Sequence, residues 1–190
     1  MPETAVSVIP FEEDWASSAH ADAEAEAFVH WNEDDPQEVP ANCAKCHSTP
    51  GYMDFIGADG SEAGVVNAPA PLGTTVECAA CHNDATAEMT SVVMPSGIEL
   101  MGLGDESRCM QCHQGRSSTV NVNAEIEDAG LAGEEHLDTG SEEVGFSNIH
   151  YYAAAATQFG TLAKGGYEYD GKTYDSKFDH VEGYDTCIDC

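Results

Sequence analysis

Basic residues are scarce in this chain of 190 residues: only 6 Lys and Arg stand against 35 Asp and Glu, and the formal net charge is −29. A surface with this charge repels phosphate backbones and anionic lipid headgroups, which argues against nucleic acids and anionic membranes as partners. We interpret the acidity as adaptation to a salt-rich habitat. Steering of a cationic partner, cation binding between subunits and a merely solvated acidic face are the alternatives.

Long apolar runs are missing as well. No stretch approaches the ~20 apolar residues of a membrane-spanning helix, and residues 1–14 have neither the basic nor the apolar region of a secretion signal. An ordinary core is also poorly supplied, because much of the 42% apolar content is Ala and Cys, with 18 Gly and 8 Pro interrupting it. We therefore expect that side-chain packing alone does not form the hydrophobic core, and that another apolar group contributes to it.

Cysteine provides the strongest pattern. All 8 cysteines fall into C-x-x-C pairs, and a histidine directly follows three of the four pairs. C-x-x-C-H is the attachment signature of a c-type haem. Its two thiols can form thioethers with the vinyl groups on one edge of the porphyrin, and its imidazole binds the iron as the proximal ligand. The predicted attachment residues are Cys43, Cys46, Cys78, Cys81, Cys109, Cys112, Cys187 and Cys190, and the predicted proximal ligands are His47, His82 and His113.

The fourth pair, Cys187 and Cys190, ends the sequence, so the histidine that would complete its motif is not included. We interpret it as a truncated motif and expect haem c at about four per chain. Structural zinc, disulfides and dithiol redox pairs are the alternatives for such pairs. Because haem c is attached outside the cytoplasm, we expect that a secretion signal has been removed and that thioethers occupy the thiols.

Six-coordinate irons need a second axial ligand, and neutral imidazole is the usual one. Outside the motifs the sequence offers four good candidates for distal ligands: His20, His30, His150 and His180. Their pairing with individual haems cannot be assigned from the sequence. His136 lies in an acidic loop flanked by glycines, and we predict that its side chain is solvated.

Local patterns predict a few short elements. Strong helix formers predict helices over residues 17–31 and 148–159. A Pro-Ser-Gly turn predicts a pair of strands within residues 91–100, and an Asp-Gly turn predicts a hairpin within residues 169–174. Residues 1–14 are expected to form an extended lead-in.

On its three complete motifs and one truncated motif, the chain resembles the multihaem c-type cytochromes of respiratory and extracellular electron transfer. The segments around His20, His150 and His180 are similar to the distal-ligand segments of such proteins. The resemblance implies a mostly irregular chain with short α-helices and a few short β-hairpins, organised around a row of covalently bound haems. It also implies electron transfer between closely spaced haems in the periplasm or at the cell surface.

One multihaem cytochrome domain is expected over residues 1–190. It would comprise a lead-in (1–16), a three-haem part (17–113), and a segment (114–190) with distal ligands and the fourth motif; longer relatives with further motifs would fit this ending too. The resemblance implies redox proteins or neighbouring copies of the chain as partners, with an oligomer or a filament among the assemblies of the family.

An enzyme is the alternative from another class: a multihaem reductase of a small nitrogen or sulfur compound. Such an enzyme needs one iron with an open position and nearby groups that deliver protons. The available histidines suffice to fill every iron site, and no attachment motif has lysine in place of its histidine. We therefore expect an electron carrier rather than an enzyme, and no catalytic residue is predicted.

Overall fold

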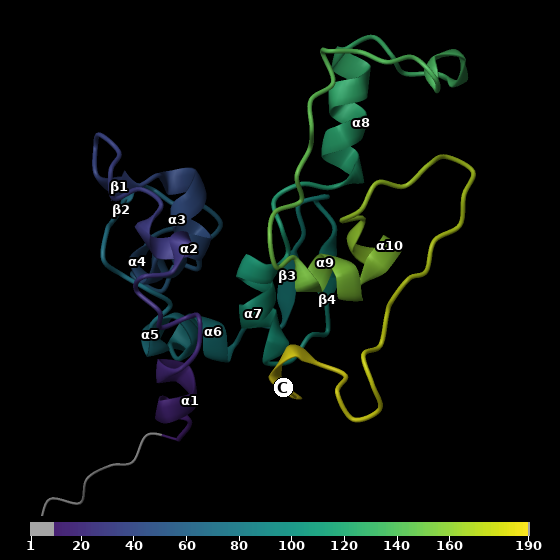
Figure 1. Cartoon of the computed structure of the whole chain (residues 1–190). Coiled ribbons are helices and arrows are strands. Elements are labelled where there is room, and N and C mark those ends of the chain that lie inside the picture. Colours follow the sequence, from purple (N-terminus) through teal and green to yellow (C-terminus); the bar gives the residue numbers. More distant parts are fainter. Residues whose placement is uncertain (1–9, 190) are drawn as a thin grey trace, which may run out of the picture. The chain divides into compact units, whose positions relative to one another are not determined.

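The structure, a computed structural model, describes residues 10–189. Its chain divides into two compact units between Ala87 and Glu88 (Figure 1). Within the described residues, each unit combines short helices, irregular chain and one two-stranded antiparallel sheet. No helix in this range is long and apolar enough to cross a membrane. The predicted fold class, mostly irregular chain with short helices and small hairpins, is confirmed.

The first unit is built around two helices, α3 and α4, that pack against each other. Gly51 of α4 makes this possible, because a Cβ atom there would lie 2.4 Å from the carbonyl oxygen of Ala44. Trp31, Val39 and Ala70 complete a small buried cluster around Ala44. The elements of this unit are α1 (Glu12–Ala16), α2 (Glu26–Val29), β1 (Glu38–Val39), α3 (Ala41–His47), α4 (Thr49–Phe55), β2 (Ala70–Pro71), α5 (Cys78–Cys81) and α6 (Asp84–Ala87).

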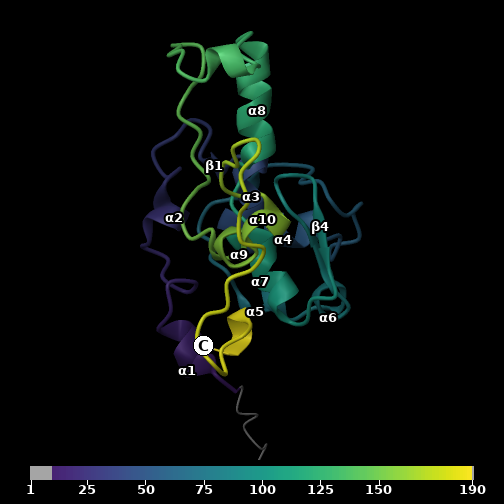
Figure 2. The same ribbon diagram turned by 90° about the vertical axis from the view of Figure 1, so that its right-hand side faces the viewer.

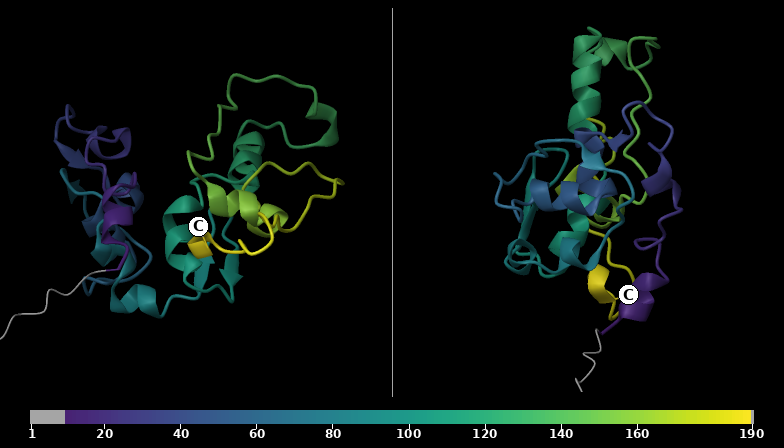
Figure 3. Two further views of the ribbon diagram at one scale, coloured as in Figure 1. Left: turned by 60° about the horizontal axis from the view of Figure 1, so that its bottom comes forward. Right: turned by 90° about the vertical axis from the view of Figure 1, so that its left-hand side faces the viewer.

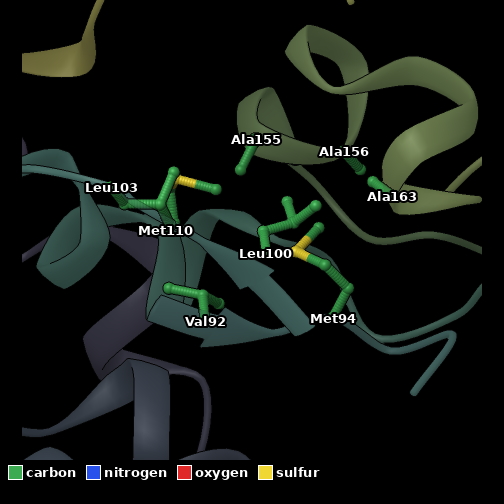
Figure 4. Packing of buried hydrophobic residues seen from close by; sticks show 8 residues of the cluster. All are labelled: Val92, Met94, Leu100, Leu103, Met110, Ala155, Ala156 and Ala163. Carbon is green, nitrogen blue, oxygen red and sulfur yellow. The ribbon is translucent and has the colours of Figure 1, made fainter. Parts of the chain in front are cut away.

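The second unit has the larger apolar cluster. Side chains from its hairpin and from α7 meet the alanines of α9 and α10, and Figure 4 shows Met110 and Leu100 close to Ala155. Small alanine side chains let the helices approach the hairpin closely. The elements are β3 (Ser91–Val93), β4 (Glu99–Met101), α7 (Glu106–His113), α8 (Thr119–Asp128), the 3₁₀ turn η1 (Glu134–His136), α9 (Ala154–Gln158), α10 (Gly160–Ala163) and the 3₁₀ turn η2 (Cys187–Asp189).

The predicted pair of strands forms: β3 and β4 are antiparallel, with Val92 opposite Leu100. The second predicted hairpin does not form. The amide of Lys172 donates to the carbonyl of Tyr169, so a turn is present, but residues 164–186 form a long loop without a described strand (Figure 2). The loop ends at η2, which lies beside α7 (Figures 1 and 3).

The predicted helix over residues 17–31 is wrong for most of its length, because α2 begins only at Glu26. Two side chains compete with the helical hydrogen bonds: the Ser18 hydroxyl donates to the Trp15 carbonyl, and the Asp22 carboxylate accepts from the Glu24 amide. Such local bonds stabilise turns instead of a helix. The like charges of Asp22 and Glu26, one helical turn apart, also disfavour it.

Two other local predictions differ from the structure. Of the extended lead-in, residues 1–9 lie outside the described residues, while Glu12–Ala16 forms α1. The helix expected over residues 148–159 begins only at Ala154 and ends at Gln158. His150 therefore precedes α9 instead of lying in its first turn.

Candidate functional site

The first and third C-x-x-C-H motifs lie on helices and end with them. His47 is the last residue of α3, and His113 is the last residue of α7. Cysteines three positions apart lie about 60° apart around a helix, so each pair presents both thiols on one face. All four cysteines of these two motifs are half-buried: Cys43, Cys46, Cys109 and Cys112.

The second motif lies on α5, a single turn, and His82 directly follows it. Cys78 is exposed and Cys81 is half-buried. The Asn83 side chain accepts a hydrogen bond from the Thr86 amide at 2.9 Å and donates to the Ala79 carbonyl at 2.8 Å. These bonds fix the chain directly after His82, whose own side chain is exposed.

Two of the three motif histidines are held by main-chain carbonyls. Nδ1 of His47 is 2.8 Å from the Ala27 carbonyl oxygen, and Nδ1 of His113 is 2.9 Å from the Tyr152 carbonyl oxygen. A carbonyl only accepts hydrogen bonds, so Nδ1 carries the proton and Nε2 keeps its lone pair. This is the tautomer and the orientation that a metal-binding imidazole needs. The donor set thus fits a c-type haem: two accessible thiols on one helix face, followed by an imidazole with a lone pair on Nε2.

Trp31 links His47 to a candidate distal ligand. The buried indole meets the His47 ring edge to face, with centroids 5.2 Å apart and planes 68° apart. The same indole also packs against the His30 ring, with centroids 5.0 Å apart and planes 81° apart. Nδ1 of His30 lies 2.9 Å from the Glu26 carboxylate one helical turn earlier. The structure therefore brings His30 into the neighbourhood of the first motif.

His20 lies beside the chain that enters the second motif. Its carbonyl accepts a hydrogen bond from the Val76 amide at 3.1 Å, and the Trp15 indole donates to the Val76 carbonyl at 2.9 Å. Val76 is two positions before Cys78, and both its amide and its carbonyl are thus hydrogen-bonded to residues 15–20. The His20 side chain is exposed.

His150 is placed by a strained segment that docks on the end of α7. Its φ of 87° is in the left-handed region that a residue with a Cβ rarely adopts, and the Asn148 side chain accepts its amide hydrogen at 2.8 Å. The Arg116 amide donates to the Ile149 carbonyl at 3.0 Å, and Gly115 is close to the same carbonyl. Strain of this kind persists where the surrounding contacts over-determine it.

His180 is the least constrained candidate. It lies in the exposed loop, with its ring 6.4 Å from the Tyr184 ring. Cys187 is exposed on η2, beside α7, and Cys190 lies outside the described residues. His136, expected to be solvated, is half-buried, with Nε2 3.9 Å from the Glu135 carboxylate.

Hydrogen bonds lower the pKa of two carboxyl groups in this acidic protein. The amide of Asn67, followed by its side chain, lowers the pKa of Asp54 at the end of α4. The amide and hydroxyl of Thr186 lower the pKa of Asp189, which lies within the fourth cysteine pair. Each carboxylate closes a turn. Its pKa is lowered because hydrogen bonds to the charged form favour ionisation.

Structural zinc would need a tetrahedral set of ligands. Over residues 10–189, no group of three or more His, Cys, Asp and Glu side chains comes together in a way that could hold a metal ion.

Ala27, Tyr152 and Trp31 belong to the site although no sequence pattern predicts them there. The first two act through main-chain carbonyls, which leave no mark in the side-chain pattern. The position of Trp31 next to His30 is the one sequence signal that could have singled it out.

Comparison with known proteins supports the haem interpretation. Residues 26–114, less than half of the chain, match the family model described as cytochrome c7 and related cytochrome c. This range contains all three complete C-x-x-C-H motifs. No curated protein and no solved structure gives a significant match. The family match, the motifs and the tautomers set at His47 and His113 together support a multihaem c-type cytochrome, an electron-transfer protein that carries haem c.

Proposed function

We propose that the protein passes electrons between about four six-coordinate haems in the periplasm or at the cell surface. The eight cysteines form the thioethers, and the three motif histidines are the proximal ligands. His20, His30, His150 and His180 are the distal ligands. Haem supplies the one-electron chemistry of its iron, while the chain sets ligand orientation, spacing and electrostatics.

The observation that carries this proposal is the pair of hydrogen bonds from His47 to Ala27 and from His113 to Tyr152. They fix which nitrogen is available to iron in two motifs that belong to different units of the chain. A hydrogen bond at Nδ1 also makes the imidazole a stronger donor, which stabilises ferric iron. Such ligands suit a low-potential electron carrier.

The net charge of −29 should act in the same direction. Carboxylates around a haem favour the oxidised, more positive state, and salt screens this effect. Redox proteins with a basic docking face, or neighbouring copies of the chain in an oligomer or a filament, are the proposed partners. The acidity itself is proposed to reflect a salt-rich habitat.

Haem counting and low-temperature EPR of the protein matured in its own host test the proposal. About four haems per chain, all low-spin in the oxidised protein, is the expected result. A high-spin iron that binds added nitrite or sulfite would instead favour the reductase. Protein that contains no covalent haem would contradict the proposal altogether.

A further inference from the structure

The hydrogen bonds of His47 and His113 also constrain the distal ligands. Iron bound at Nε2 lies on one side of the imidazole, and the carbonyl bound at Nδ1 lies on the other side. The segment that provides this carbonyl is therefore on the proximal side of that haem. A distal ligand must come from the opposite face of the porphyrin.

His30 is too close to Ala27 to reach that opposite face. The His30 amide donates to the Glu26 carbonyl at 3.1 Å, which keeps residues 26–30 in one helical turn. Ala27 and His30 are thus separated by ~4.5 Å along the helix axis. Trp31 packs edge to face against both imidazoles, which keeps the two rings next to one buried indole.

His150 has the same relationship to His113. Tyr152, whose carbonyl binds Nδ1 of His113, is two residues away, so its Cα lies at most ~7 Å from that of His150. The bond from the Arg116 amide to the Ile149 carbonyl holds the residue before His150 on the end of α7 as well. His150 is therefore on the proximal side of the haem of its neighbouring motif.

We propose that each of these two segments serves two haems. Residues 26–31 orient the proximal imidazole of the first motif and place His30 as the axial ligand of the second-motif haem. Residues 148–152 orient the proximal imidazole of the third motif and place His150 as the axial ligand of the fourth-motif haem. This inference rests on the proposed distal ligation and adds the pairing that the sequence leaves open.

Each unit contains one further attachment pair besides that of the first or third motif. We assign His30 and His150 to the haem of that further pair. In the first unit, α4 packs against both α3 and α5, which carry the first and second motifs. In the second unit, η2 lies beside α7, and the Gln158 side chain at the end of α9 donates to the Asp185 carbonyl at 2.9 Å. Cys187, the described cysteine of the fourth pair, thus lies on an element that packs against α7, close to the elements that flank His150.

The arrangement has a consequence for electron transfer. The ring of a proximal ligand and the ring of the next haem's ligand are held by one short segment. In the first unit they are joined by the buried Trp31 indole. Two irons connected in this way keep a fixed separation, which a tunnelling step requires.

The pairing can be tested by NMR of the intact haem protein with isotope-labelled histidine. Ring resonances of His30 and His47 are assigned with the variants His30→Gln and His47→Gln, and contacts from each ring to porphyrin meso protons are measured in the reduced state. Contacts of His30 with the second-motif haem and of His47 with the first are expected. Contacts of both rings with one porphyrin would overturn the proposal.

EPR of variants provides an independent test. His30→Ala should convert one low-spin haem per chain to high spin, and His136→Ala is the control that should convert none. The His30→Ala change is then repeated in Cys43→Ala/Cys46→Ala/His47→Ala, which lacks the first haem. We expect His30→Ala to produce a further high-spin haem in that background. If it produces a high-spin haem in the complete protein but not in the protein without the first haem, the pairing is wrong.

The two proposals fail in different ways. If His30→Ala and His150→Ala leave every haem low-spin in the complete protein, distal ligation by these residues is wrong. If each produces a high-spin haem, but the affected haem is that of the first or the third motif, distal ligation stands and the pairing is wrong.

Discussion

Nδ1 of His113, at the end of α7, donates a hydrogen bond of 2.9 Å to the carbonyl oxygen of Tyr152, 39 positions later in the chain. Gly115 follows His113 by two residues and lies close to Ile149, in the segment that leads to Tyr152. A Cβ atom there would be 2.6 Å from the Ile149 carbonyl oxygen, and its φ of +79° is in the left-handed region. Glycine therefore permits the approach that brings Tyr152 to the imidazole.

Gly115→Ala should separate the segment around Ile149 from α7. We expect a loss of about 1–3 kcal/mol in stability, from the close contact and the strained φ together. The EPR g-values of the third-motif haem should change too, because the His113 ring loses its fixed orientation. Thermal unfolding and EPR of the haem protein measure both effects.

Gly145→Ala is the matched control, because no atom lies within 4 Å of its added Cβ and its φ is not positive. The control should change neither the melting temperature nor the EPR spectrum. Equal effects of the two substitutions would contradict the role given to Gly115.

Local patterns predicted local features well. The C-x-x-C-H motifs carry their chemistry in adjacent residues, and the hairpin of β3 and β4 follows from strand-forming residues around one turn. The helix over residues 17–31 failed because Ser18 and Asp22 bind nearby main-chain groups instead. The carbonyl of Tyr152 could not be predicted, since it is a main-chain group placed by tertiary contacts far along the chain.

Trp15→Phe tests how His20 is held beside the second motif. Phenylalanine keeps an aromatic ring but lacks the N–H that donates to the Val76 carbonyl. The loss of this bond should cost about 0.5–1.5 kcal/mol. Hydrogen exchange at the Val76 amide, which pairs with the His20 carbonyl, should become faster. Glu13→Gln, an exposed change on the same helix, should leave that exchange rate unchanged.

The three motif histidines should differ in how fast their Nδ1 protons exchange with water. Carbonyls hold the rings of His47 and His113, whereas no group among the described residues is hydrogen-bonded to the exposed His82 ring. Exchange should therefore be fastest at His82. NMR of the reduced protein with nitrogen-labelled histidine measures it. Slower exchange at His82 than at His47 would contradict the assignment of the carbonyl partners.

The carboxylate of Asp54 should make stability depend on pH in the acidic range. It accepts hydrogen bonds from the Asn67 amide at 2.6 Å and from the Ser61 hydroxyl at 2.9 Å, which close the loop after α4. These bonds lower its pKa below the ordinary value of 3.8. The contribution is therefore fully present above pH 3.8 and disappears as the pH falls through the lower, folded-state pKa.

Asp54→Asn removes this titration. The variant should be less stable than the wild type near neutral pH, and the difference between their melting temperatures should shrink as the pH falls below 3.8. The other carboxyl groups, including Asp189, titrate in both proteins, so their effect on the melting temperature cancels in this difference. Glu62→Gln, an exposed change in the same loop, should show no such pH-dependent difference. A difference for Asp54→Asn that stays constant across this range would mean that the charged form of Asp54 does not stabilise the loop.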